Sequence, residues 1–281
     1  KNIDAKVRAF LGPDIEFEYD WVSLYTFQCR RMKNFVHDRV IFAGDSAHLV
    51  SPFGARGANG GMQDVDNLVW KLALIFKGIA PASFINSYDD ERIHGADENV
   101  TNSSRSTDFM TPKSEISLAF RDAALELARD FPFARRIVNP GRLSTPCTLD
   151  GSPLNTEDED EFTSKQRPGS PCMDAPIQVN KEDGWFLNQI GERFIGLHFI
   201  DVEDSLAGNP SSLNLHPIAL DVLTVGEAHA NIFDKHGLLK KHYDAEPGTF
   251  YLIRPDQHIA ARWRKIEPNK IQLAMLKASG N

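Results

Sequence analysis

The sequence predicts an α/β protein built from two unequal parts joined by an irregular stretch. Residues 39–78 read as a short strand, a glycine-rich loop and a helix in immediate succession. Residues 139–176 are rich in proline and glycine and carry the acidic run EDEDE. Beyond them the apolar pattern runs strand, helix, strand, hairpin and helix. We therefore divide the chain into residues 1–138, 139–176 and 177–281.

The first part begins with two segments of contrasting pattern. Residues 3–11 carry apolar side chains at helical spacing and end at Gly12-Pro13, which predicts a short helix. Residues 15–29 are dominated by aromatic and β-branched side chains, the composition of a strand.

The apolar run at residues 40–43 has the length and composition of a buried strand, and it stops at Gly44-Asp45. In an open α/β sheet, ligands bind beyond the carboxyl ends of the strands. A carboxylate placed there can accept hydrogen bonds from sugar-like hydroxyl groups. Asp45 is therefore the first candidate for a ligand-binding side chain.

Glycines fill the loop after Asp45, and a helix follows it. The four glycines at positions 54, 57, 60 and 61 remove side-chain bulk, so backbone N–H groups can approach a flat ligand. From Met62 to Phe76 apolar residues recur every three or four positions until Gly78 stops the helix. The positive end of a helix dipole in this loop favours a ligand that is anionic or becomes so.

Two further helices are predicted before the irregular stretch. The first lies within residues 81–106 and should bury Phe84, Ile85, Tyr88 and Ile93. The second is capped by Ser114 and runs to about Asp130, and residues 131–138 add one or two turns. Residues 139–176 should form a linker on the surface. Its acidic run is interpreted as a solvated loop in preference to a metal site.

The last part repeats strand and helix patterns on a smaller scale. We expect a helical turn at residues 185–190, strands at 194–200 and 218–225, and helix-compatible sequence at 229–242. Residues 250–253 and 259–263 flank a turn and predict a hairpin. A helix over residues 268–278, burying Ile271, Leu273, Ala274 and Leu276, closes the chain.

Composition limits the possible functions. The 281 residues carry a formal net charge of −8 without a basic cluster, which argues against a nucleic-acid partner. The three cysteines, at positions 29, 147 and 172, are too few and too far apart for a disulfide framework or thiolate metal site. No apolar run approaches the length of a membrane span and no signal peptide is visible. A soluble protein of the cytoplasm fits these features.

The ordered motifs GDSAH, PFGARGAN and GMQDVDNLVWKLA resemble the second FAD-binding motif of the aromatic-ring hydroxylases, the flavin monooxygenases related to p-hydroxybenzoate hydroxylase. The resemblance implies that residues 1–138 form the C-terminal part of an FAD-binding domain. It also implies roles for six residues. Asp45, in the turn with Gly44, would bind the ribityl chain of FAD, Pro52 would lie beside the ring edge where oxygen reacts, and the backbone N–H groups of Gly57, Ala58 and Asn59 would hold the pyrimidine end.

Other residues of this region remain open to two interpretations. By the same resemblance Tyr25, and less directly Arg31, could contact a phenolic substrate, but Tyr25 also reads as one more aromatic in a sheet face. His48 reads better as a packed or hydrogen-bonded turn residue than as a catalyst, because no nucleophile with an orienting acid is apparent. The stretch SYDDER resembles a packing element of the family. Ala55-Arg56 departs from the Gly-Gln of many members, which puts the charge near the flavin in question.

The tail supplies a second resemblance. Its element order and the segment YLIRPDQHIAARWR resemble the thioredoxin-like tail of a phenol-hydroxylase subgroup. Dithiol exchange needs two nearby cysteines, and residues 201–216 contain none, so residues 177–281 are predicted to be a redox-inactive thioredoxin-like domain.

Together the resemblances imply an FAD-dependent monooxygenase that hydroxylates an aromatic substrate with NADPH or NADH and dioxygen. The chain opens without the G-x-G-x-x-G unit that binds the ADP half of FAD. We therefore expect a missing N-terminal half, no activity in this fragment alone, and a homodimeric parent enzyme. The alternatives are another GD-motif flavoprotein, such as a reductase or halogenase, or a non-catalytic dimerisation fragment.

Overall fold

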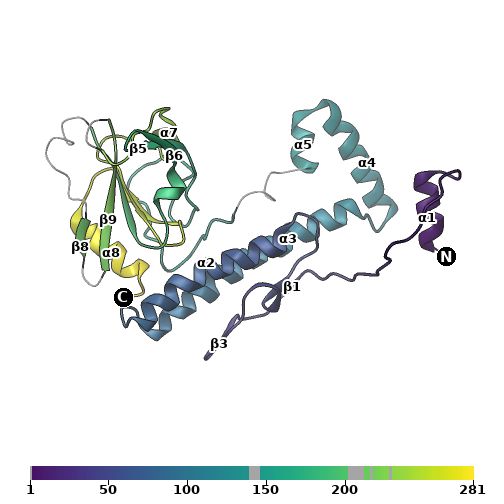
Figure 1. Cartoon of the computed structure of the whole chain (residues 1–281), viewed down its shortest axis with the longest axis horizontal. Helices are drawn as coiled ribbons and strands as arrows, with labels where there is room; N and C mark the ends of the chain where they lie inside the picture. The colour runs from purple at the N-terminus through teal and green to yellow at the C-terminus, as the bar shows by residue number, and fades with distance from the viewer. Residues whose placement is uncertain (1, 139–145, 202–211, 216–217, 228–229) are drawn as a thin grey trace.

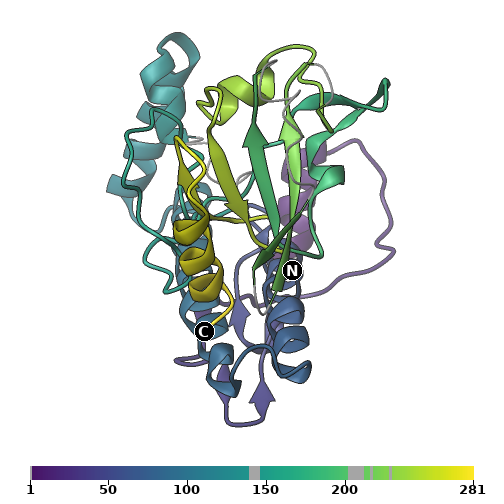
Figure 2. The ribbon, with the colours of Figure 1, turned by 90° about the vertical axis from the view of Figure 1, so that its left-hand side faces the viewer.

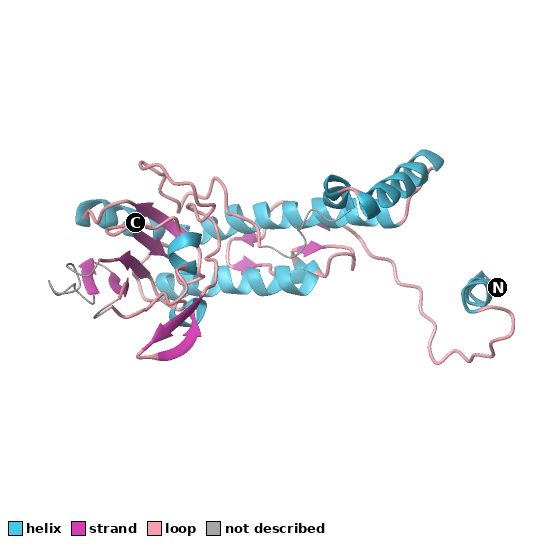
Figure 3. Ribbon diagram, turned by 90° about the horizontal axis from the view of Figure 1, so that it is seen from above, coloured by secondary structure: helices cyan, strands magenta, loops and turns pink. Residues whose placement is uncertain are grey.

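The computed structural model describes residues 2–138, 146–201, 212–215, 218–227 and 230–281. Two long helices, α2 (Arg56–Phe76) and α3 (Asn86–Met110), run side by side through the centre, linked by the short 3-10 turn η2 (Ala82–Ile85). The C-terminal sheet lies against one end of this pair, and α4 and α5 lie near the other end (Figure 1). Seen from above, the two helices form a rod with the short N-terminal strands along it (Figure 3).

The N-terminal region contains the predicted helix but not the predicted strand at residues 15–29. Helix α1 (Asn2–Leu11) forms and ends at Gly12, whose φ is +99°. Residues 15–29, predicted to be a strand, contain no regular strand, and the side chain of Leu24 is 96% exposed. A strand needs a neighbouring strand to bond its backbone groups, and none pairs with this segment within the described ranges. The composition identified a strand former, but the pairing partner decides whether a strand exists.

Four very short strands surround the predicted ligand turn. β1 (Arg30–Arg31) pairs antiparallel with β4 (His48–Leu49), and β2 (Val36–His37) pairs antiparallel with β3 (Val40–Ile41). The expected buried strand at residues 40–43 is therefore only a two-residue arm of a hairpin. Val40 is 57% exposed, because no second sheet layer covers it in the part of the chain that the structure describes.

Helix α2 corrects the sequence prediction twice. It begins at Arg56, six residues before Met62, so three of the loop glycines lie inside its first two turns. Its fully buried side chains include the polar Asp64, Asn67 and Lys71, whereas Met62, Val65, Val69 and Phe76 of the apolar stripe are exposed. The predicted helical period of the apolar residues is correct, but the polar face of α2 is the one that contacts α3 and the C-terminal sheet.

The following helices match their predicted ranges more closely than their predicted faces. α3 buries Phe84 of the preceding turn and Tyr88 as expected, while Ile85 and Ile93 pack against the same region partly buried. α4 (Glu115–Asp130) begins after Ser114, whose hydroxyl accepts a hydrogen bond from the Ser117 N–H at 3.1 Å. α5 (Pro132–Val138) follows it. Only Ala124 of α4 is buried, and the large apolar side chains of this helix are exposed: Ile116, Leu118, Phe120, Leu125 and Leu127.

The C-terminal part is built on a five-stranded sheet in the order β11-β10-β7-β9-β8. Its strands are β7 (Ile195–Phe199), β8 (Ser212–Leu215), β9 (Ile218–Val225), β10 (Phe250–Ile253) and β11 (Ile259–Trp263). Only β7 and β9 are parallel, and the other neighbours are antiparallel. Helix α8 (Pro268–Ala278) lies across one face of the sheet (Figure 2).

Most of the predicted C-terminal elements are confirmed. β9, β10, β11 and α8 have the predicted ranges, and the turn η4 (Phe186–Gln189) forms where expected. Helix α7 (Leu238–His242) is shorter than the predicted 229–242, of which residue 229 lies outside the described ranges. Leu273 is 67% exposed instead of buried. The hairpin of β5 (Pro176–Val179) and β6 (Glu182–Trp185) was not predicted, because charged and glycine residues weaken its pattern.

Residues 146–176 are irregular as predicted and partly exposed, but some of their side chains are buried in the core. Leu149 and Leu154 are at most 3% exposed. The backbone continues the sheet edge, since the Gly169 N–H donates to Ile259 O at 2.7 Å and the Ile259 N–H to Ser170 O at 3.0 Å. The acidic run is also not simply solvated, because Asp158 accepts two hydrogen bonds from Arg262 at 2.9 and 2.6 Å. Basic side chains on β11 supply partners that the local sequence could not reveal.

One apolar core crosses the predicted boundary between the parts. Trp70 of α2 packs edge-on against both Phe84 and Phe194, with ring centroids 5.5 and 5.7 Å away. These rings share a cluster with residues of β9, β10, β11 and α8. The division of the chain at residues 139–176 stays a prediction. In the described residues the two parts pack against each other through this core and so stabilise one another. Among the described helices, none combines the length and apolarity needed to cross a bilayer.

Candidate functional site

The predicted ligand turn is a short 3-10 helix, η1 (Gly44–Ser46). Gly44 has φ +60°, a conformation that favours glycine. The Ser46 hydroxyl donates to Ala43 O at 2.7 Å and closes the turn. The Asp45 side chain is exposed at its tip. The turn thus presents one carboxylate to the outside on a backbone that is internally braced.

Asp64 of α2 anchors this turn through hydrogen bonds. Its Oδ2 accepts hydrogen bonds from the Gly44 N–H at 2.8 Å and from His48 Nε2 at 2.6 Å, and its Oδ1 accepts one from Arg92 Nε at 2.7 Å. Burial alone would raise the pKa of Asp64, but the His48 hydrogen bond, the Arg92 charge and the Gly44 N–H together lower it. Asp64 is therefore an ionised, fully buried anchor.

His48 has a structural place in this arrangement. Its side chain is 2% exposed and lies against Asp64. An ionised carboxylate only accepts hydrogen bonds, so the proton resides on His48 Nε2. The interpretation of His48 as a hydrogen-bonded turn residue is thereby confirmed.

The first turn of α2 carries backbone N–H groups next to the Asp45 turn. In a helix that begins at Arg56, the N–H groups of Gly57 and Ala58 have no intrahelical acceptor, whereas Asn59 can reach the carbonyl of Ala55. The Asn59 side chain also donates to Ala55 O at 2.8 Å. Of the three predicted backbone donors, helix geometry therefore favours Gly57 and Ala58 over Asn59.

The loop glycines divide into two roles. A Cβ on Gly61 would lie 3.4 Å from Gly44 Cα, and one on Gly60 would lie 3.3 Å from both His48 Cε1 and Asn99 Nδ2. These two glycines permit close packing of α2 on the turn and on α3, not ligand approach. At Gly57 a Cβ would meet only Val50, at 3.8 Å, so this position is open as predicted.

The loop carrying Pro52 is anchored to α3. Ser51 Oγ lies 2.7 Å from both Ser103 Oγ and Thr107 Oγ1, while the neighbouring Pro52 is exposed. Arg56 is buried, and its guanidinium donates to Asn99 Oδ1. The charge at the departure from the Gly-Gln pattern therefore points into the helix pair.

A cavity of about 700 Å³ opens beside this loop. It is bounded by Phe53 and Gly54, by the end of α3, and by α4 and α5, with Arg105 and Arg121 among its lining. The Phe53 ring meets Phe27 edge-on at 5.9 Å, and Phe27 lies 6.4 Å from Tyr25. A row of aromatic rings thus leads from Tyr25 to Phe53, which lines the cavity.

Tyr25 and Arg31, the two predicted substrate contacts, lie in different environments. Tyr25 is 77% exposed and is not among the described residues that line the cavity. Arg31 is also not among the described residues that line the cavity, and its Nε and Nη2 donate to the Asp97 carboxylate at 2.6 and 2.8 Å, so its contact with a substrate stays a prediction. That pair fixes β1 to α3.

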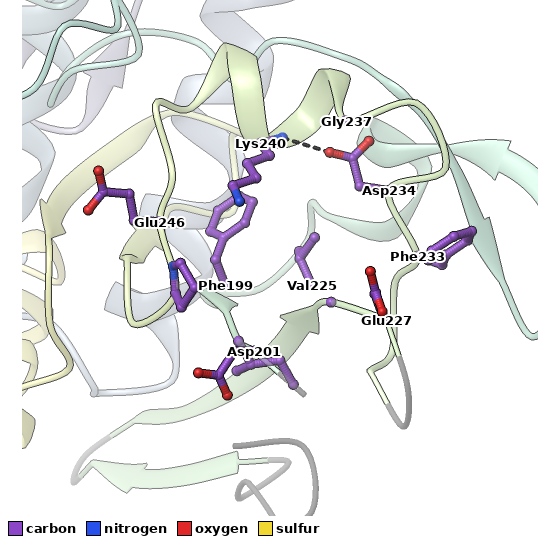
Figure 4. Close-up of a pocket in the computed structure, with 12 residues that line it drawn as sticks. Phe199, Asp201, Val225, Glu227, Phe233, Asp234, Gly237, Lys240 and Glu246 are labelled. Carbon is purple, nitrogen blue, oxygen red and sulfur yellow. Dashed lines mark hydrogen bonds between the residues drawn. The ribbon is translucent and has the colours of Figure 1, made fainter. Parts of the chain in front are cut away.

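A second cavity, of about 310 Å³, lies beyond the carboxyl ends of β7 and β9 (Figure 4). The Lys240 N–H donates to Asp234 Oδ2 at 2.8 Å at its rim. The lining of this cavity contains no cysteine. It includes these apolar and acidic residues: Phe199, Asp201, Val225, Glu227, Phe233, Asp234 and Glu246. Cys147 and Cys172 are buried elsewhere, and burial raises the pKa of both thiols, that of Cys172 to about 12. Neither of these two buried thiols is therefore poised for exchange.

Sequence reasoning missed Asp64, Arg92 and Ser51 as the groups that hold the site. Asp64 and Asn67 are polar residues three apart on α2, so they share a face, but the sequence does not say that this face is buried. The resemblance predicts only a packing role for the SYDDER stretch, whereas Glu91 and Arg92 in it are buried ion-pair partners. Groups of three acidic, histidine or cysteine side chains able to hold a metal ion are absent from the described residues.

Comparison with known proteins agrees with the motif reading. Residues 3–103 match the family model described as FAD binding domain. A 3-(3-hydroxy-phenyl)propionate/3-hydroxycinnamic acid hydroxylase from Comamonas testosteroni is 31% identical over 125 residues, 44% of this chain and 21% of the relative. The protein of the same name from Escherichia coli is 25% identical over 253 residues, 85% of this chain and 45% of the relative.

Solved structures show the same fold. The flavin-dependent monooxygenase PieE, in complex with FAD and substrate, matches with a TM-score of 0.76 and 21% identity, covering 99% of this chain and 54% of that one. The chain thus spans about half or less of the length of these relatives. The predicted α/β fold class and the resemblance to FAD-dependent aromatic hydroxylases are confirmed. The individual site residues and the thioredoxin-like character of the tail stay predictions.

Proposed function

We propose that this chain is the C-terminal portion of an FAD-dependent monooxygenase that hydroxylates a phenolic substrate with NADPH or NADH and dioxygen. The observation that carries the proposal is the Gly44–Asp45 turn, fixed by Asp64 beside the open N-terminus of α2. The turn carries the exposed Asp45 carboxylate, and its Gly44 N–H bonds to Asp64 of the same helix whose first turn contains Gly57 and Ala58. The similarity to the FAD binding domain family supports the cofactor class.

The residues fit the two chemically different ends of a flavin. The exposed Asp45 carboxylate suits the hydroxyl groups of a ribityl chain, and Gly44 belongs to the turn that presents it. The backbone N–H groups of Gly57 and Ala58 suit a polar ring edge that gains negative charge on reduction. The open surface at Gly57 leaves room for such a ring to approach the backbone. We therefore assign Gly57 and Ala58, through their N–H groups, and Asn59, in the same helical turn, to the pyrimidine end.

The bound cofactor would supply oxygen activation, using electrons from the nicotinamide. The share of this chain is positioning and exclusion of water. Pro52 sits on a loop that Ser51 anchors to α3, so its position relative to α2 is defined. We assign Pro52 to the reacting edge and the cavity beside Phe53 to the substrate ring, with Tyr25 at the mouth. Arg105 in the lining favours a substrate with an anionic substituent, as in the propionate named for the relatives.

The remaining assignments concern the whole enzyme. Exposed apolar side chains of α2, including Met62 and Val65, favour burial against an N-terminal half of the same polypeptide. Those of α4, including Ile116, favour a homodimer contact. We place the enzyme in the cytoplasm and propose that residues 1–281 alone are inactive.

The test is the substitution Asp45→Ala in the enzyme that retains FAD. Loss of a hydrogen bond to a charged group should weaken FAD binding by roughly 1.5–3 kcal/mol, measured as the dissociation constant by equilibrium dialysis. Asp14→Ala is the control, because Asp14 is an equally exposed aspartate distant in sequence from the turn. An unchanged dissociation constant in Asp45→Ala would remove the assignment of this turn.

A further inference from the structure

A buried cluster of charges joins the C-terminal sheet to the central helices. The Glu91 carboxylate accepts hydrogen bonds from Arg254 Nη1 and Nη2 at 2.5 and 2.9 Å. It also accepts from Lys71 Nζ and Asn67 Nδ2, both at 2.7 Å, and from Ser152 Oγ at 2.5 Å. Arg254 follows β10, and Glu91 lies in α3, 163 residues earlier. Two helices and one hairpin therefore meet at a single carboxylate.

Asp256 completes the cluster from the same hairpin. It accepts hydrogen bonds from Arg254 Nη2 at 2.5 Å and from Asn67 Nδ2 at 3.1 Å. The side chains of Lys71, Glu91, Arg254 and Asp256 are each at most 1% exposed. Two cations thus balance two anions, so the cluster is neutral as a whole. Removal of any one member leaves an uncompensated charge in the interior.

A second buried cluster lies directly beside the first one and ends at the ligand turn. Arg92, the residue after Glu91, donates to Asp64, which accepts from the Gly44 N–H. Asp64 and Asn67 occupy positions three apart on α2 and belong one to each cluster. Consecutive residues on α3 and residues three apart on α2 therefore connect the β10–β11 hairpin to the Gly44–Asp45 turn, with hydrogen bonds within each cluster and the two helices between the clusters.

Apolar contacts hold the same joint closed. The Arg254 guanidinium carbon lies 5.2 Å from the Trp70 ring centroid, and Trp70 packs against Phe194 of the sheet. The chain terminus adds to this contact, because a Cβ on Gly280 would lie 2.3 Å from a ring carbon of Phe84. Close packing of this kind transmits displacement instead of absorbing it.

We propose that Arg254 and Asp256 are positioning residues for the Gly44–Asp45 turn, so that the C-terminal sheet is a working part of the ligand site and not an appendage. They act through Glu91 and Asn67 on α3 and α2, and from there through Arg92 and Asp64 on the Gly44 N–H. The coupling itself is a property of this chain, and only its consequence for FAD rests on the proposed function. A sheet with a merely local structural role would leave the Gly44 N–H unaffected.

The primary experiment compares Arg254→Met with Arg262→Met in the 281-residue chain. Arg262 is the matched control because it is also a buried arginine of this strand pair, ion-paired to Asp158, but with no described bond to α2 or α3. Amide hydrogen exchange of a peptide spanning residues 40–50 is measured by mass spectrometry. We expect exchange of the Gly44 amide to accelerate at least tenfold in Arg254→Met and to stay within twofold of wild type in Arg262→Met. Equal acceleration in both variants, or none in Arg254→Met, overturns the proposal.

Two further variants cover loss of folding and nonspecific effects. Asp256→Asn keeps the size of the side chain and one acceptor, so it tests the same joint if Arg254→Met does not fold. Arg254→Lys retains the charge but not the paired N–H groups, and it should restore part of the protection at Gly44. Exchange of a peptide within residues 116–128 of α4 reports whether the rest of the chain is intact. Failure of Arg254→Lys to recover any protection while Arg254→Met remains unprotected would count against a charge-mediated link.

The FAD dissociation constant of the flavin-retaining enzyme separates this inference from the proposed function. If both hold, Arg254→Met and Asp45→Ala each weaken FAD binding at least fivefold, and Arg262→Met does not. If exchange at Gly44 rises but Asp45→Ala leaves FAD binding unchanged, the coupling stands and the proposed function fails. If Asp45→Ala weakens FAD binding but exchange at Gly44 is unaffected by Arg254→Met, the coupling alone fails.

Discussion

Lys71 offers a quantitative test of the buried charge cluster. Its side chain is 0% exposed, and its ammonium donates to Glu91 Oε2 at 2.7 Å and to Asn67 Oδ1 at 2.9 Å. Burial lowers the pKa of Lys71 from 10.5 to about 8, although Glu91 acts in the opposite direction. The attraction to Glu91 therefore does not fully offset the loss of hydration.

The shift of Lys71 sets both the sign and the size of a pH effect on stability. At a value of 1.36 kcal/mol per pKa unit, the protonated lysine costs the folded state about 3 kcal/mol relative to the unfolded chain. Between about pH 8 and 10.5 the unfolded chain binds more protons, so stability rises with pH. This gain in stability is complete above the pKa of Lys71 in the unfolded chain, and it is lost as the pH falls through the pKa of Lys71 in the folded chain. From about pH 7 to about pH 9.5 the gain is about 2 kcal/mol.

The assay is urea unfolding of wild type and Lys71→Met, followed by circular dichroism at the two pH values. Methionine keeps most of the volume but does not titrate, so the constant cost of the substitution cancels in the difference between the two pH values. We expect wild type to gain about 2 kcal/mol relative to Lys71→Met. Lys113→Met, at a lysine whose side chain is 80% exposed, should follow wild type. Parallel pH profiles of wild type and Lys71→Met would refute the assignment of Lys71 as a strained, buried cation.

Three further outcomes are expected. Residues 1–281 expressed alone should bind no stoichiometric FAD, since the sequence has no G-x-G-x-x-G for the pyrophosphate; a flavin absorbance band at equimolar ratio, on material of verified intact mass, would contradict this. Ala55→Gly should change the unfolding free energy by no more than about 1 kcal/mol, because relief of the left-handed backbone at φ 51° is opposed by the entropy of glycine; thermal unfolding checks this, and a larger loss would show that the Ala55 methyl contributes to packing. The chain should not reduce insulin disulfides, because dithiol exchange needs two neighbouring cysteines and residues 201–216 contain none; dithiol turnover above the background rate would disprove it.

The sequence by itself determined the elements whose pattern is local. The ranges of β9, β10, β11 and α8 follow from apolar periodicity, turn residues and the proline that starts α8. The Ser114 cap of α4 was likewise readable, because capping involves residues three apart. The FAD-binding motif and the exposed Asp45 turn were found for the same reason, since order and spacing along the chain carry them.

Only the tertiary structure decided which faces are buried and which charges pair. α2 has two faces at helical spacing, and the sequence favoured the apolar one, whereas Asp64, Asn67 and Lys71 on the other face are buried. A polar face can be buried only if its partners arrive from elsewhere, and Arg254 reaches Glu91 across 163 residues of sequence. Residues 15–29 show the converse case, because their strand composition has no effect without a neighbouring strand to bond. Periodicity fixes the local element, but burial and ion pairing are properties of what the fold brings beside it.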